Sequence, residues 1–190
     1  MTDNQRLYDG IGRAAWGYLF IYFDFNINTV SIIPSFVGYL LFLSAVNYLE
    51  EDERELSLLR TPAIILTAWH VASWLASWAA IDLDGLLTVV DIIVGVVNIY
   101  FHFQLLTNLA SIASRHQKEE ELDRKLLGYR TLQTVMLTAV IILSYISNLL
   151  DGIAVFVSVC MTVVYLVAGI LLMKVLFDLR RCFTCDNEAA

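Results

Sequence analysis

Apolar side chains gather along this chain in six long blocks that are separated by polar segments. The blocks run from about 11 to 25, 32 to 49, 62 to 81, 86 to 113, 129 to 150 and 153 to 177. A helix needs about 20 mostly apolar residues to cross the hydrocarbon core of a bilayer. Because the blocks come close to or exceed that length, the pattern predicts six transmembrane helices.

Two kinds of connection alternate strictly between these blocks. The connections at 50–61 and 114–128 are long and charged, whereas DFNINTVS, DLDG and LLDG are short and contain no basic residue. Short connections join antiparallel neighbours. The chain is therefore predicted to form one membrane domain of three consecutive helical hairpins, and these hairpins cover about 11–49, 62–113 and 129–177.

The basic residues indicate which way the hairpins point. All 12 Lys and Arg residues lie in or next to the N-terminus, the two long connections or the C-terminus. The positive-inside rule then places both termini, the loops 50–61 and 114–128 and the tail 178–190 in the cytoplasm. The first block is short, so the first hairpin either spans the bilayer with a tilt or re-enters on one side, and neither case changes this orientation.

Composition supports a membrane location. Hydrophobic residues make up 58% of the 190 residues and charged residues only 16%, against about 25% charged residues in soluble proteins. We expect an all-α integral membrane protein, six transmembrane helices with both termini inside, whose first partner is the lipid bilayer. The net charge of −7 argues against a nucleic-acid partner, because nucleic acids are bound by basic surfaces.

The fourth block carries the most informative polar pattern. Asp91, Gly95, Asn98, His102 and Asn108 follow one another at spacings of 4, 3, 4 and 6 residues, which places them on one face of a helix. A charged residue at the bilayer centre is unfavourable by about 2.5–3.5 kcal/mol, so such a face normally turns toward other helices. It is either a pathway for a proton, cation or polar substrate, or a set of interhelical hydrogen bonds.

Two further polar residues could extend this face. His70 lies near the middle of the third block, at a depth that differs from that of His102 by about a helical turn or more. Asp24 lies in the first outward turn, near the outer end of the face. A metal site needs further ligands at matched depth, and Cys182 and Cys185 form only half of a zinc motif. No metal and no cofactor is therefore predicted.

Two other blocks carry small or hydroxyl-bearing residues at helical spacing. Such residues let helices approach closely in lipid, and the alternative is a polar cavity lined from several helices. The residues are Gly10, Ala14 and Gly17 in the first block, and Ser158, Thr162, Tyr165 and Gly169 in the sixth.

The segment PSFVGYLL, at residues 34–41, resembles a loosely defined set of uncharacterised small multi-pass membrane proteins of bacteria. Those proteins carry Pro-x-Phe-x-Gly-Tyr at the same place, often with Asp after Pro, where this chain has Ser35. The resemblance covers the first hairpin, implies a bacterial-type inner or plasma membrane, and implies no activity. In length, helix number and topology the chain is also similar to the substrate-binding membrane subunits of energy-coupling-factor transporters, whose signature motifs it lacks.

Two functional hypotheses follow. In the first, the protein is a transport, small-molecule-binding or ion-binding membrane subunit, and Asp91, Asn98 and His102 line a polar path near His70 and Asp24. In the second, it is a regulatory, immunity or assembly subunit that docks a protein partner through its charged cytoplasmic loops. Catalytic motifs such as Gly-x-Ser-x-Gly and His-Glu-x-x-His are missing, so no enzyme is predicted.

Overall fold

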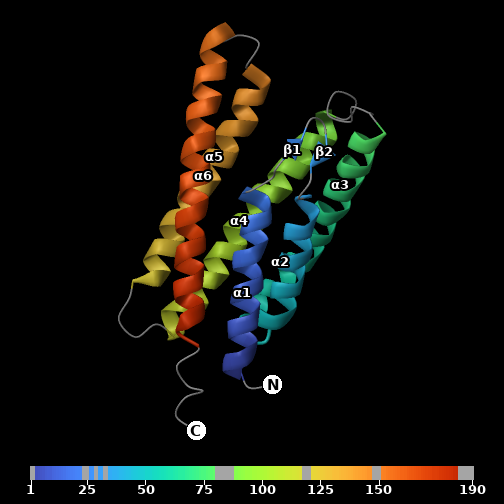
Figure 1. The fold of residues 1–190 in the computed structure, drawn as a ribbon. Coiled ribbons are helices and arrows are strands. Elements are labelled where there is room, and N and C mark those ends of the chain that lie inside the picture. The colour runs from blue at the N-terminus through green and yellow to red at the C-terminus, as the bar shows by residue number, and fades with distance from the viewer. Residues whose placement is uncertain are drawn as a thin grey trace.

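The structure, a computed structural model, describes residues 3–22, 26–27, 30–31, 34–79, 88–116, 121–146 and 151–183. Within these residues the chain forms six α-helices, one 3-10 helix and a small antiparallel hairpin. The helices are α1 (Asp3–Tyr22), α2 (Phe36–Leu49), α3 (Arg60–Trp78), α4 (Thr88–His116), α5 (Leu122–Ile146) and α6 (Asp151–Arg181) (Figure 1). The 3-10 helix η1 (Arg54–Leu59) joins α2 to α3, and the strands β1 (Asn26–Ile27) and β2 (Val30–Ser31) lie between α1 and α2.

Each of the six apolar blocks forms a helix, which confirms the helical class. Three helices contain stretches that are long and apolar enough to cross a bilayer, at Val89–His116 in α4, Leu122–Leu143 in α5 and Val155–Arg181 in α6. By contrast, α2 has 14 residues and α1 begins in a polar segment. The strand pairing of Asn26 with Ser31 and of Ile27 with Val30 was not predicted from the sequence.

Two helices begin earlier than the apolar blocks. The first helix begins at Asp3 because Leu7 and Ile11 continue its buried stripe into the polar N-terminal segment. The fifth helix begins at Leu122, inside the predicted loop 114–128, and Leu122 and Leu126 are both buried. In both cases charged residues on the opposite face lengthen the helix without interrupting its apolar stripe.

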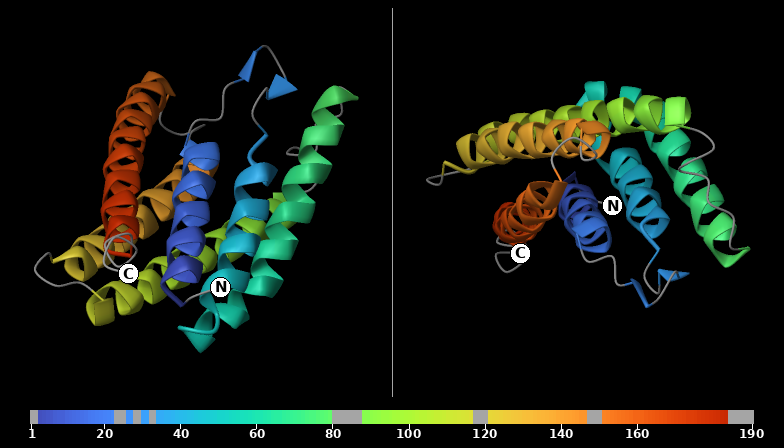
Figure 2. Two further views of the ribbon diagram at one scale, coloured as in Figure 1. Left: turned by 60° about the horizontal axis from the view of Figure 1, so that its bottom comes forward. Right: turned by 90° about the horizontal axis from the view of Figure 1, so that it is seen from above.

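The six helices pack as two layers. Figure 2 shows α6, α1 and α2 side by side in one layer, with α4 and α5 paired in a second layer that crosses behind it and α3 beside α2. The start of α1, the end of α6 and the 3-10 helix η1 lie at one end of the bundle, and the β1–β2 hairpin lies at the other (Figure 1). Successive helices therefore run in opposite directions (Figure 1).

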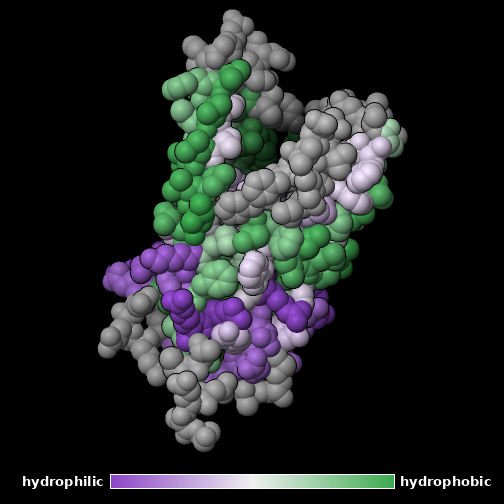
Figure 3. Space-filling model, viewed as in Figure 1, coloured by the Kyte–Doolittle hydropathy of each residue, from purple (hydrophilic) through white to green (hydrophobic). Residues whose placement is uncertain are grey.

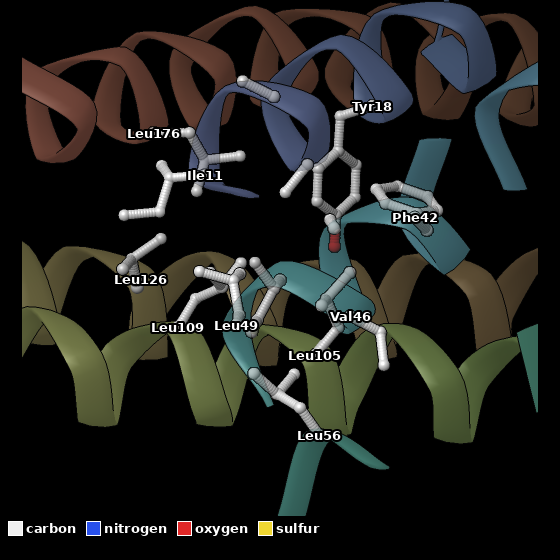
Figure 4. Packing of buried hydrophobic residues seen from close by; sticks show 14 of the residues in the cluster. Ile11, Tyr18, Phe42, Val46, Leu49, Leu56, Leu105, Leu109, Leu126 and Leu176 are labelled. Carbon is white, nitrogen blue, oxygen red and sulfur yellow. The ribbon is translucent and has the colours of Figure 1, made fainter. Parts of the chain in front are cut away.

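The hydrophobic core lies between the two layers. Ile11 and Tyr18 of α1 and Leu176 of α6 point toward Leu105 and Leu109 of α4 (Figure 4). All five side chains are buried. This packing fixes which face of α4 turns inward, and it is the face that carries the predicted polar residues.

The outer surface of the long helices remains apolar and exposed. Only 11% of the most apolar stretch of α6 is buried inside the protein. Figure 3 shows hydrophobic side chains over most of the bundle, whereas hydrophilic side chains gather around the end where α1 begins and α6 ends. Apolar surface on this scale is what a protein in contact with lipid exposes.

Two glycines set the distance between α1 and α2. A methyl group added to Gly38 would lie 2.8 Å from the carbonyl oxygen of Gly17, and one added to Gly17 would lie 3.0 Å from the carbonyl oxygen of Gly38. The backbones of the two helices are therefore in contact at this point. The small-residue face predicted for the first block is confirmed here.

Replacing Gly38 with Ala tests this contact. Because the new methyl group meets backbone that has no room to move, we expect Gly38→Ala to lower the free energy of unfolding by about 1–3 kcal/mol. Gly128→Ala is the matched control, since nothing lies within 4 Å of a methyl group at that exposed position of α5, and it should be neutral or stabilising by about 0.5–1 kcal/mol. Denaturant-induced unfolding of the purified protein measures both. Equal effects of the two substitutions would contradict the close crossing.

Candidate functional site

The polar face of α4 turns toward α1 and α2. His102 is only 2% exposed, and its Nδ1 lies 3.2 Å from the hydroxyl oxygen of Tyr18 on α1. One turn earlier, the side-chain carbonyl oxygen of Asn98 accepts a hydrogen bond of 2.8 Å from the hydroxyl of Tyr39 on α2. Two of the residues predicted from the sequence are therefore brought to one place, and each is held by a tyrosine.

His70 of α3 contacts the same tyrosine of α2, Tyr39, that binds Asn98. Its ring stacks on Tyr39, with 4.8 Å between ring centroids and 17° between ring planes. Its Nδ1 lies 3.0 Å from Oγ of Ser35. The ring of His102 lies 6.3 Å from that of Tyr39. The two histidines, predicted to differ in depth, are thus linked through one tyrosine ring.

Of the two predicted aspartates, only Asp91 lies among the described residues. Asp91 is half-buried in the first turn of α4, seven residues and about 10 Å along the helix axis from Asn98. It therefore lies nearer the β1–β2 end of the bundle than the histidines do. Asp24 lies outside the described residues.

Four buried or half-buried tyrosines complete the arrangement, and only Tyr165 among them was named in the sequence analysis. The rings of Tyr18 and Tyr22 are stacked at 5.9 Å, and Tyr22 meets Tyr165 of α6 at 4.6 Å. We call the group the tyrosine–histidine cluster. Its members are Tyr18, Tyr22, Tyr39, His70, Asn98, His102 and Tyr165.

Local sequence explains why these tyrosines face inward. Tyr18 and Tyr22 lie four residues apart and continue the buried stripe of Leu7 and Ile11, so they belong to the core face of α1. Tyr39 follows Gly38, the residue at the helix crossing, and belongs to the PSFVGYLL segment. That segment and the spacing of the α1 stripe were the signals that could have identified these tyrosines from the sequence.

One polar atom of the cluster lacks a partner. Among the described residues, Nε2 of His102 is buried and makes no hydrogen bond. The imidazole is enclosed by the rings of Phe42 and Phe101, at centroid distances of 5.7 and 5.4 Å. Buried polar atoms are nearly always hydrogen-bonded, so each exception requires an explanation. This nitrogen can donate or accept a proton or a hydrogen bond.

A cavity of about 400 Å³ adjoins the α6 end of the cluster. Tyr165 belongs both to the cluster and to the cavity wall, which α5 and α6 form together. Most of the wall is apolar, with hydroxyl groups on one side. The lining residues are Leu137, Val140, Leu143, Ser158, Met161, Thr162 and Tyr165. In the sixth block, Gly169 therefore packs against the ring of Tyr22, as close helix packing requires, while Ser158, Thr162 and Tyr165 line a cavity that is mostly apolar and not the polar cavity of the alternative interpretation.

The acidic loop between α2 and α3 is largely neutralised within the chain. Arg115 of α4 pairs with both Asp52 and Glu53, at 3.0 Å in each case. Glu51 pairs with Arg6 and Glu50 with Arg60. These ion pairs hold the loop against α1 and α4. They also reduce the unpaired negative charge that a protein partner could contact.

No metal site emerges from the residues that the structure describes, since none of their His, Cys, Asp and Glu side chains form groups of three or more suited to hold an ion. The cluster itself contains no Lys, Arg, Asp or Glu. Its chemistry is therefore that of hydroxyl, amide and imidazole groups in an aromatic surrounding, which suits hydrogen bonding and proton exchange.

Comparison with models of protein families, with curated proteins and with solved structures found no match to this chain. The function must therefore be inferred from the geometry of the tyrosine–histidine cluster and the adjoining cavity.

Proposed function

We propose that this protein is a membrane subunit that transports or binds a small molecule. In this proposal it has six transmembrane helices, and both termini lie in the cytoplasm of a bacterial-type cell. Three helices are long and apolar enough to span, and α1 to α3 pack against them in an up-and-down order. The end of the bundle where hydrophilic side chains gather also holds the start of α1 and the end of α6 (Figure 3). Basic residues mark that end as cytoplasmic.

Accessibility of single cysteines tests this orientation. In a background where Cys160, Cys182 and Cys185 are replaced by Ser, we expect Leu83→Cys to react with a membrane-impermeant maleimide in intact cells. Glu120→Cys should react only after the membrane is permeabilised, because it lies in a cytoplasmic connection. Labelling of position 120 from outside would contradict the proposed orientation.

One observation supports ligand binding most directly. A series of ring contacts leads from the cavity, at Tyr165, through Tyr22 to Tyr18, whose hydroxyl lies 3.2 Å from Nδ1 of His102. The other ring nitrogen of His102, Nε2, is buried and makes no hydrogen bond among the described residues. A cluster that served only to hold helices together would need neither a cavity at one end nor an unpaired nitrogen. Binding sites for small molecules have this composition, with apolar walls, a volume of about 300–1,000 Å³ and a few polar groups.

The composition of the site also limits the ligand. A bare ion would be bound weakly, because the cluster offers no opposite charge and burying an unpaired charge is strongly unfavourable. A neutral, largely apolar molecule with one or two hydrogen-bonding groups suits the cavity better. Its apolar part would fill the space between α5 and α6, and its polar group would reach the hydroxyl of Tyr165.

Filling the cavity tests this proposal. We expect the neutral fluorophore N-phenyl-1-naphthylamine, an aromatic amine, to bind saturably to the protein in lipid nanodiscs, above the background of empty nanodiscs. Met161→Trp should abolish that binding by occupying the cavity. Tyr165→Phe, which removes one hydrogen-bonding group, should weaken it by about 0.5–1.5 kcal/mol, roughly 2- to 12-fold.

Val163→Trp is the matched control for this experiment. It adds the same side chain to the same helix at a position that is 59% exposed and lies outside the cavity wall. It should bind the fluorophore as the unmodified protein does. Equal binding by Met161→Trp and Val163→Trp would show that the cavity is not the site.

A further inference from the structure

Eight of the nine arginines of this protein fall into two groups. In the first group each guanidinium pairs with a carboxylate, and its members are Arg6, Arg60, Arg115, Arg124 and Arg181. In the second group each guanidinium is half-buried and lies over an aromatic ring, with no carboxylate within 4 Å among the described residues. Its members are Arg13 over Tyr48, Arg130 over Phe103 and Arg180 over Tyr8. The exposed Arg54 of η1 belongs to neither group.

Neutral contacts hold Arg13 of α1 against α2, and Arg180 of α6 against α1. Arg13 lies 4.3 Å from the ring centroid of Tyr48 and donates hydrogen bonds to Ser44 and to the Tyr48 hydroxyl. Arg180 lies 3.9 Å from the ring centroid of Tyr8. Gly12 provides the space for Arg180, because a methyl group there would lie 3.0 Å from its Nε. These contacts orient both guanidinium groups and leave their charge uncompensated.

The acidic residue nearest in sequence does not supply the missing charge. Asp9 lies one turn before Arg13 on α1, but no ion pair joins them, and its carboxylate accepts a hydrogen bond of 3.2 Å from Gln5. Among the described residues no carboxylate pairs with Arg13 or Arg180, so their remaining donors are available to an anion. A guanidinium matches the geometry of a phosphate group, which accepts two parallel hydrogen bonds from it.

The surroundings of these arginines suit a lipid. Trp16 is 48% exposed on α1, one turn beyond Arg13, and packs edge-on against Phe177 of α6 with 6.1 Å between ring centroids. Tryptophan is typical of the layer where headgroups meet acyl chains. Figure 3 shows that hydrophilic surface gives way to hydrophobic surface along this side of α1, α2 and α6. An acyl chain could continue from here along the exposed apolar side chains of α6.

We propose that the face of α1 between Arg13 and Arg180 binds an anionic phospholipid of the cytoplasmic leaflet. The phosphate lies against the guanidinium groups, and the acyl chains lie beside Trp16 and α6. The assignment to the cytoplasmic leaflet rests on the proposed orientation, but binding of the lipid does not. Arg130, on the α4–α5 layer, is not part of this face.

Lipid-dependent stability tests the proposal. The midpoint of thermal unfolding is measured for the full chain in detergent with added phosphatidylcholine, and then with phosphatidylglycerol of the same acyl chains. We expect phosphatidylglycerol to raise the midpoint of the unmodified protein. The double variant Arg13→Gln, Arg180→Gln should lose most of that increase. Each variant is compared with its own value in phosphatidylcholine, so that a variant of lower intrinsic stability still reports lipid binding.

The double variant Arg124→Gln, Arg181→Gln is the matched control. It removes the same charge from the same end of the bundle, at two exposed arginines that already have carboxylate partners, and it should keep the full increase. Equal responses of the two double variants, or no response of the unmodified protein, would overturn the proposal. An equal increase with soluble glycerol phosphate would also overturn it, because the site would then bind a free phosphate and not a lipid.

Discussion

The contact between Gly17 and Gly38 is the constraint on which the rest of the site depends. The residues that follow these glycines are Tyr18 and Tyr39, so the point where the two backbones meet also brings these tyrosines together. Both rings pack against Phe42, at centroid distances of 4.9 and 6.1 Å. If the two helices crossed at a greater distance, the hydroxyl groups of Tyr18 and Tyr39 would lie further apart. His102 and Asn98 of α4 could then not both reach their tyrosine partners.

On the polar face of α4, Asn98 and His102 therefore have hydroxyl groups of other helices as partners. Hydrogen bonds between membrane helices contribute modestly, on average about 0.6 kcal/mol in the best-measured case. The aromatic contacts around His102 and Tyr39 supply dispersion and exclude water over a larger area. The ion pairs of the acidic loop, by contrast, lie at the end of the bundle where α1 begins and α6 ends.

Periodicity and block length were sufficient to predict the helices and the inward face of α4. They were not sufficient to predict which residues contact that face, because the contact of His102 with Tyr18 joins residues 84 positions apart. Tyrosines inside apolar blocks are equally consistent with lipid contact, so their role became clear only with the packing. Asp91 shares the face of Asn98 but lies at another depth, because seven residues along a helix are about 10 Å.

The cavity lies where the packing of α6 changes. From Val155 to Cys160 every side chain of α6 is exposed, and Gly169 is the first buried residue of the helix among those whose burial is described. The contacts of Tyr165 and Gly169 with Tyr22 are therefore the place where the apolar half of α6 is first held against α1. A molecule in the cavity would touch Tyr165 at that point, and any shift of its ring would be transmitted to Tyr22 and then to Tyr18, which contacts His102. Tyr165, Tyr22 and Tyr18, which belong to only two helices, thus connect the cavity to the buried imidazole by direct contact.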